Sequence, residues 1–209
     1  MFKFFESLTR PFPEADPVQP PEGIYAFCRH YTKGFAAPLI AMSVLTAIIA
    51  ALEVSLFGFM GQLVDWLTTK NPETLWLEES DTLIAMGITV LLVIPLLILL
   101  HSLIVHQTLL GNYPMAIRWL AHRYLLKQSI SFFQNDFAGR VATKVMQTSL
   151  AVRETVMKLL DVMVYIIVYF SSMLIIIMSA DVRLVIPMVI WFLIYVLIQV
   201  KMVPKLKKI

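Results

Sequence analysis

Four long apolar runs constrain the fold of this chain more than any other feature of its sequence. They cover residues 35–67, 82–110, 159–180 and 184–203 of the 209 residues. A helix needs ~20 mostly apolar residues to cross the ~30 Å hydrocarbon core of a membrane, and each run is long enough. A buried helix of a soluble protein would be shorter and would carry a polar stripe. The sequence therefore predicts an all-α, polytopic membrane protein with four long transmembrane helices.

Composition supports this fold class and excludes others. Hydrophobic residues make up 59% of the chain, charged residues 15%, and the mean hydropathy is +0.78. These values argue against both a soluble globular domain and a disordered chain. Cys28 is the only cysteine, which excludes a disulfide framework or a cysteine-based metal cluster. The seven glycines are isolated from one another and form no nucleotide-binding loop, so we expect no cofactor-binding site in this chain. We expect no metal site either.

The basic residues are distributed asymmetrically about the four runs. Of the 17 Lys and Arg residues, four lie in residues 1–34, seven in residues 112–158 and four in residues 201–208. The remaining two are Lys70 and Arg183, in the connections after the first and third runs. Because Lys and Arg are enriched in cytoplasmic loops, this pattern predicts that both termini and the long middle connection are cytoplasmic.

The flanking segments complete the predicted organisation. Residues 1–22 are rich in proline and are expected to form an N-terminal cytoplasmic arm. Residues 23–34 have apolar residues at helical spacing, which favours a short amphipathic helix in the membrane interface over a solvated linker. Residues 35–209 then form the membrane domain. Its second helix, 82–111, is expected to extend to 131, and its third, 159–180, to follow a cytoplasmic helical extension at 141–158.

The tip of this cytoplasmic hairpin is a candidate docking site. Phe132, Phe133 and Phe137 cluster far from lipid, around residues that turn the chain. Exposed apolar residues favour docking to a partner, although the three rings could instead cover one another. The predicted docking residues are Phe133, Gln134, Asn135, Asp136, Phe137, Gly139 and Arg140.

These motifs resemble those of one known family. The sequence Phe132-Phe133 followed by Gly139-Arg140-Val141 and Lys144-Val145 is similar to the first intracellular loop of half-size ATP-binding-cassette (ABC) exporters, the bacterial multidrug or lipid exporters with fused permease and ATPase domains. The segment Gly61 to Asp65 resembles the end of their first transmembrane helix, and the stretch before Phe35 their elbow helix. The resemblance covers about residues 20–209.

The resemblance implies further properties. Residues 133–139 would form the first coupling helix, seated on a nucleotide-binding domain. That domain, fused downstream in a longer ATP-hydrolysing parent, would bind ATP and Mg. The partners would be membrane lipid and a second half-transporter, as a homodimer, in the bacterial inner membrane. A complete domain of this family has six spans, and this chain has four, so we expect it to be part of a longer exporter.

Two other functional classes remain open at this stage. The first is a stand-alone four-span scaffold or regulator with a docking hairpin. The second is a proton-coupled carrier, which would need more than one carboxylate within the spans, and Glu53 is the only candidate that the sequence singles out. Glu53 either belongs to a substrate pathway or is merely hydrated. The spacing of His101 and His106 does not place them on one helix face, which argues against a metal site, so we expect interfacial or packing roles for both. The basic residues between Arg118 and Lys144 could also suggest nucleic-acid binding. This segment continues a membrane-spanning helix, which argues against that function.

Overall fold

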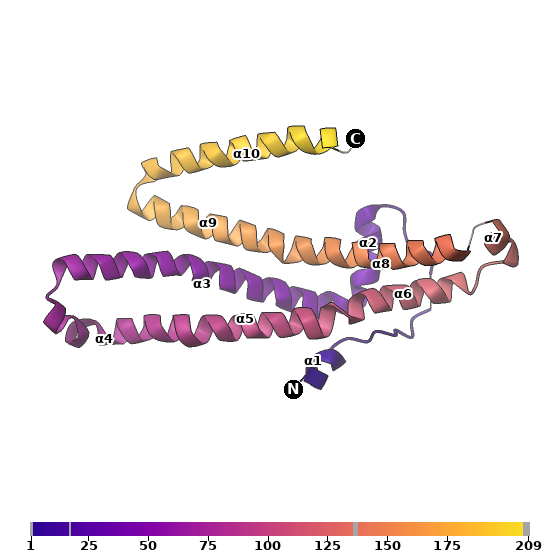
Figure 1. Ribbon diagram of the computed structural model, residues 1–209, viewed down its shortest axis with the longest axis horizontal. Helices are drawn as coiled ribbons and strands as arrows, with labels where there is room; N and C mark the ends of the chain where they lie inside the picture. The colour runs from indigo at the N-terminus through magenta and orange to yellow at the C-terminus, as the bar shows by residue number, and fades with distance from the viewer. Residues whose placement is uncertain (1, 17, 136–137, 207–209) are drawn as a thin grey trace.

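The computed structural model describes residues 2–16, 18–135 and 138–206, and within these parts the chain is helical and contains no strand (Figure 1). Four helical stretches in the described chain are long and apolar enough to cross a membrane, so the predicted fold class is confirmed. They cover residues Ile24–Thr69, Thr74–Leu125, Gly139–Ala180 and Val182–Lys205.

The first stretch combines the short helix α2 (Ile24–Thr32), the 3₁₀ turn η1 (Lys33–Phe35) and the long helix α3 (Ala36–Thr69). The third combines α8 (Ala138–Leu160) and α9 (Val162–Ala180), and the turn η4 (Val182–Leu184) then leads into α10 (Val185–Leu206). The turns that follow α3 and α9 lie at one end of the molecule, and the hairpin tip at α7 lies at the other (Figure 1).

The second stretch is less regular than the sequence predicted. It starts at Pro72 with α4 (Pro72–Ile88), which bends at Glu79. Two π-helical segments, η2 (Thr89–Val93) and η3 (Ile104–Leu109), flank α5 (Ile94–Leu103). The following helix α6 (Asn112–Leu125) ends six residues before position 131, because the chain turns through i to i+3 bonds and then forms the separate short helix α7 (Ile130–Asn135). Serines at the start of α7 favour such a break, since their hydroxyls compete with helical hydrogen bonds.

A buried cluster, which we call the inner core, lies where α3, η3, α6 and α8 meet. Its members are Phe35, Leu39, Met42, Leu109, Tyr113, Ala116, Ile117, Val152 and Val156. Along α3 the buried residues recur every three or four positions, which places them on one helix face. Tyr113 is fully buried, and its hydroxyl lies 2.8 Å from the Thr32 hydroxyl of α2, so α2 is tied to the core.

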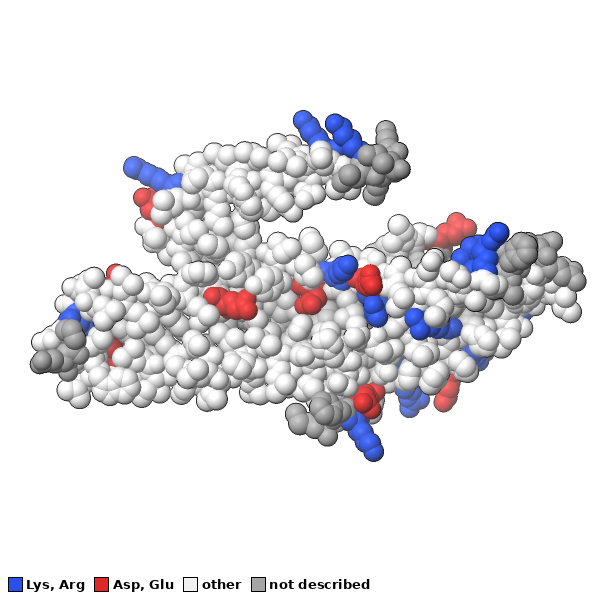
Figure 2. All heavy atoms as spheres, viewed as in Figure 1, with Lys and Arg blue, Asp and Glu red and all other residues white. Residues whose placement is uncertain are grey.

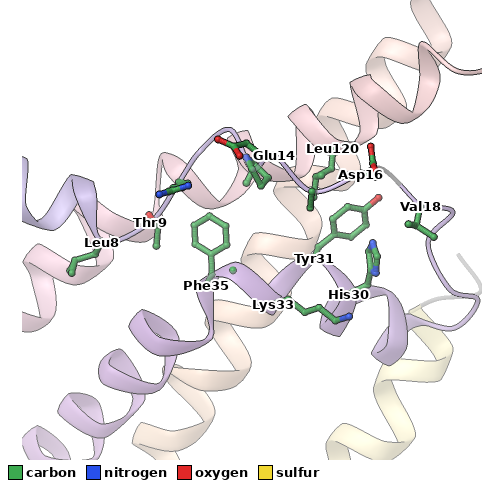
Figure 3. A pocket seen from close by; sticks show the side chains of 15 residues that line it. Leu8, Thr9, Glu14, Asp16, Val18, His30, Tyr31, Lys33, Phe35 and Leu120 are labelled. Carbon is green, nitrogen blue, oxygen red and sulfur yellow. The ribbon is translucent and has the colours of Figure 1, made fainter.

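The N-terminal arm is attached to α6 rather than free. It begins with the short helix α1 (Phe2–Ser7), which packs against η3, and its extended part passes along α6. Asn112 donates a hydrogen bond to the Glu6 carbonyl, Trp119 to the Pro13 carbonyl, and Arg123 to the carbonyls of residues 13–15. A cavity of about 550 Å³ lies between the arm, α2 and α6. Figure 3 shows its labelled side chains, with those of Tyr31 and Phe35 below the arm.

The last helix stands apart. No described side chain of α10 is buried, and Figure 1 shows the helix diverging from α9. Its one ring contact with α9 is the stacked pair Phe170 and Phe192, with centroids 4.8 Å apart. Most of its apolar surface is therefore uncovered in the single chain.

Candidate functional site

The hairpin formed by α6 and α8 is held together by one apolar seam and one buried polar contact. Ile117 on α6 and Val152 and Val156 on α8 supply buried apolar contacts. Nearer the tip, Arg118 donates from Nε to the hydroxyl of Ser149 at 2.9 Å, and Ser149 is fully buried. Ser149 donates in turn to the carbonyl of Met146. The guanidinium therefore links the two helices, so the hairpin is one packed unit rather than two separate helices.

The tip of the hairpin exposes aromatic residues. Phe132 and Phe133 are 39% and 40% exposed and pack edge to face with centroids 5.3 Å apart. Phe133 also lines a groove of about 380 Å³ between α6 and α8, together with residues such as Leu125 and Val145. These two rings cover each other only in part and leave apolar surface open.

The other predicted docking residues are placed only in part. Gly139 and Arg140 lie exposed in the first turn of α8. Gln134 and Asn135 end α7, but their side chains are outside the described residues. Asp136 and Phe137 lie entirely outside them, so the proposed role of Phe137 stays a prediction. The third ring of the predicted cluster is therefore not located.

A polar junction within the apolar stretches joins three helices. Thr46 on α3 donates to Oδ1 of Asp161 at 2.5 Å, and His101 on α5 donates from Nε2 to the same oxygen at 3.1 Å. His101 Nε2 also lies 3.1 Å from the Thr46 hydroxyl. Asp161 occupies the break between α8 and α9. The three side chains thus form a closed set of contacts that fixes α3, α5 and α9 at one level.

Glu53 extends this polar region along α3. It lies seven residues, about two helical turns, beyond Thr46, which places both on one helix face ~10 Å apart along the axis. Tyr165, one turn beyond Asp161 on α9, donates to Oε2 of Glu53 at 2.7 Å. Tyr169 stacks on Tyr165. Figure 2 shows acidic side chains within the otherwise uncharged surface between α3 and α9. Two intramembrane carboxylates are therefore connected through the α3–α9 contact.

A cavity of about 290 Å³, which we call the junction cavity, opens at this place. Its polar wall consists of Thr46, His101, Asp161 and Tyr165. Its apolar wall consists of Ile49, Ile98 and Val162. No group of three or more metal-ligating side chains occurs in the part of the chain that the structure describes. The arrangement instead offers hydrogen-bond acceptors and an aromatic face beside a small apolar surface.

Sequence reasoning found Glu53 but missed Asp161, and the view that Glu53 is the only candidate carboxylate within the spans was incomplete. The signal was present, because Asp161 lies in the first turn of the apolar run 159–180. His101 was expected to have a packing role, and the structure places it on Asp161 instead. Only the tertiary contact shows that these residues, 60 positions apart, meet.

Comparisons with known proteins agree with this architecture. Residues 39–209 match the family of ABC transporter transmembrane regions. A protein of Haemophilus influenzae, described as an uncharacterized ABC transporter ATP-binding protein, is 41% identical over 209 residues. The alignment covers 100% of this chain and 34% of that protein, so the chain spans about a third of the length of this curated relative. No solved structure matches the chain.

Proposed function

The chain belongs to the family of ABC transporter transmembrane regions, and from this premise we propose that it is the first part of the membrane domain of an ATP-driven exporter. In this proposal the polypeptide continues into a nucleotide-binding domain that binds ATP and Mg, and two such polypeptides form a homodimer in the bacterial inner membrane. The printed description of the relative as an ATP-binding protein supports a fused ATPase domain. Family membership disfavours the alternative of a stand-alone scaffold.

The observation that carries the mechanism is the shape of the α6–α8 hairpin. α6 and α8 continue the second and third apolar stretches and end in a tip with exposed rings. We propose that residues 133–140 form a coupling element that docks on the ATPase domain. Nucleotide-driven movement of that domain would then be transmitted along the packed hairpin to the helix break at Asp161 and to α3, α5 and α9. Glu53 would lie on the translocation pathway, and multidrug solutes are one class of cargo.

The coupling role is tested on the transporter polypeptide that contains this chain. A buried aromatic anchor typically contributes ~2 kcal/mol or more to an interface, equivalent to about thirtyfold in affinity. The double variant Phe132→Ala/Phe133→Ala should therefore lower transport and substrate-stimulated ATPase activity together while ATP binding persists. Leu150→Ala is the control, because Leu150 is a similarly exposed residue of α8, 36% exposed, far from the tip. Normal transport by the double variant at normal expression would refute coupling through this tip.

Orientation is tested by accessibility. The charge distribution places Thr74 outside the cell and Ser131 in the cytoplasm. Single cysteines introduced at these positions in a Cys28→Ser background can be treated with a membrane-impermeant thiol reagent on intact cells. Labelling at 74 but not at 131 is expected. The reverse pattern would overturn the proposed orientation.

A further inference from the structure

The junction cavity has an unusual charge balance. Residues 35–69, 82–117 and 159–182, which supply its lining, contain no Lys or Arg, and Lys158, one turn before Asp161 on α8, is exposed and does not line the cavity. The same helices contribute the carboxylates of Asp161 and Glu53, which contact His101 and Tyr165 respectively. Even a protonated imidazole balances only one of the two negative charges. Ionised groups within a membrane are costly unless paired, and the lining of the cavity offers no Lys or Arg as a partner for Asp161.

The existing contacts leave acceptor capacity. Thr46 and His101 both donate to Oδ1 of Asp161, and Tyr165 donates to Oε2 of Glu53. A carboxylate has about four lone-pair positions on its two oxygens. Asp161, which lines the cavity, can therefore accept further hydrogen bonds from a donor that enters it, whereas Glu53 is connected to the cavity through Tyr165. A protonated amine supplies such donors together with a positive charge.

The walls of the cavity match the rest of such a solute. Tyr165 presents an aromatic ring, and aromatic rings attract cations at their faces. Ile49 and Val162 supply apolar contacts for carbon atoms attached to the amine. The volume of about 290 Å³ is at the lower limit of drug-sized ligand sites, so it accommodates a head group rather than a whole amphipathic molecule.

We propose that the junction cavity binds the protonated amine head of an amphipathic cargo molecule, with Asp161 as its direct counter-charge and Glu53, bonded to Tyr165, as a second acidic group beside the cavity. This inference rests on the proposed transport function and names the class of cargo. It also predicts exclusion of anionic solutes, because a further negative charge would enter a cavity whose lining contains Asp161 and no Lys or Arg.

The test compares two probes that differ at one end, where one carries a charged amine and the other a neutral acetamide. Dansylcadaverine carries a primary alkylamine, and its N-acetyl derivative is neutral. At pH 8 the amine remains protonated, as a lysine side chain with a pKa of about 10.4 would. Binding to the full transporter polypeptide in phosphatidylcholine nanodiscs is followed by dansyl fluorescence without nucleotide, with empty nanodiscs as the reference for partitioning into lipid.

We expect the wild-type protein to bind the amine about tenfold more tightly than the acetylated probe, as for a charge-assisted hydrogen bond. Asp161→Asn should bring this ratio close to one, and Glu53→Gln should reduce it in part. Asp65→Asn is the matched control, because Asp65 is an exposed acid of the same helix α3. This variant should keep the wild-type ratio.

Equal affinities for the two probes in the wild-type protein would overturn the proposal, and this result needs no variant to fold. A preference for the amine that survives in Glu53→Gln/Asp161→Asn would also overturn it. The binding measurement needs no ATP, so it is separate from the transport function. If nucleotide-driven transport is absent while the amine preference depends on Asp161, the proposed function fails and the binding site stands.

Discussion

The helices α3 and α10 have nearly the same hydropathy but very different surroundings. Their most apolar windows have mean hydropathies of 2.3 and 2.2. Seven residues of α3 are buried against α5, α8 and α9, whereas no described side chain of α10 is buried. Hydropathy therefore identifies both as membrane helices without distinguishing a packed helix from an uncovered one, because it measures transfer into lipid and not contact with other helices.

Polar side chains account for much of this difference. In lipid there is no hydrophobic drive between helices, so close packing and interhelical hydrogen bonds hold them together. On α3, Ser43 donates to the Leu160 carbonyl, and Thr46 and Glu53 bond to residues of other helices. On α10, Gln199 donates to Tyr195 of the same helix. α3 is thus attached to its neighbours, while this polar contact of α10 stays within the helix.

The strongest test of the comparison removes one tyrosine from each region. Tyr113→Ala opens a cavity in the inner core that α3 helps to form, and such truncations typically cost about 3–5 kcal/mol. In a chain of this size that corresponds to a decrease of ~10 °C in the thermal unfolding midpoint. Tyr195→Ala on α10, where the side chain is 49% exposed, should change the midpoint by less than ~2 °C. Thermal denaturation in detergent measures both, and equal shifts would show that α10 is as well packed as the inner core.

A smaller effect is expected at the polar junction. Thr46→Val keeps the side-chain shape but removes the hydroxyl that donates to Asp161, and a hydrogen bond to a charged acceptor contributes about 1.5–3 kcal/mol. Ser55→Ala is the control on the same helix, because the Ser55 hydroxyl bonds only to the Leu52 carbonyl one turn back. The unfolding midpoint should therefore fall in Thr46→Val and remain near the wild-type value in Ser55→Ala. Indistinguishable midpoints for the two variants would mean that the junction does not stabilise the bundle.

This contrast also shows how far the sequence could predict the structure. The four spans and the hairpin between the second and third follow from run length and hydropathy, since both are local properties of the chain. The end of α6 at Leu125 and the π-helical segment η3 were not predicted, because they depend on hydrogen bonds along a continuous helical pattern. The junction of Thr46, His101 and Asp161 could not be predicted, because three residues far apart in sequence meet only after the helices pack.

The N-terminal arm tests whether a polar contact can also hold an irregular segment. Arg123 donates to three consecutive carbonyls of the arm, so Arg123→Ala should release it locally at a cost of about 1 kcal/mol. Cleavage after Glu14 by a glutamate-specific protease should then become about fivefold faster, because proteolysis follows the population of the open form. Lys127→Ala is the control, since Lys127 is 59% exposed and lies 3.9 Å from Asp16. Equal cleavage rates for Arg123→Ala and the wild-type protein would show that other contacts suffice to hold the arm.

The smallest effect is expected for a substitution at the C-terminal end of α3, where this helix becomes as exposed as α10. The Lys70 ammonium lies 2.5 Å from Glu79 Oε1 and 3.3 Å from Glu78 Oε2, and the hydrogen bond to Glu79 raises the pKa of Lys70. Surface ion pairs contribute little and are screened by salt. Lys70→Met should therefore lower the unfolding midpoint by at most ~1 °C at low ionic strength, and the difference should vanish at ~0.5 M salt. Arg183→Met, in the exposed turn between α9 and α10, should have no effect at either salt concentration. A large, salt-independent decrease in the unfolding midpoint of Lys70→Met would show that the ion pairs stabilise the end of α3 as strongly as burial stabilises its packed face. The end of α3 would then resemble α10 in its exposure but not in the contribution of its charged side chains to stability.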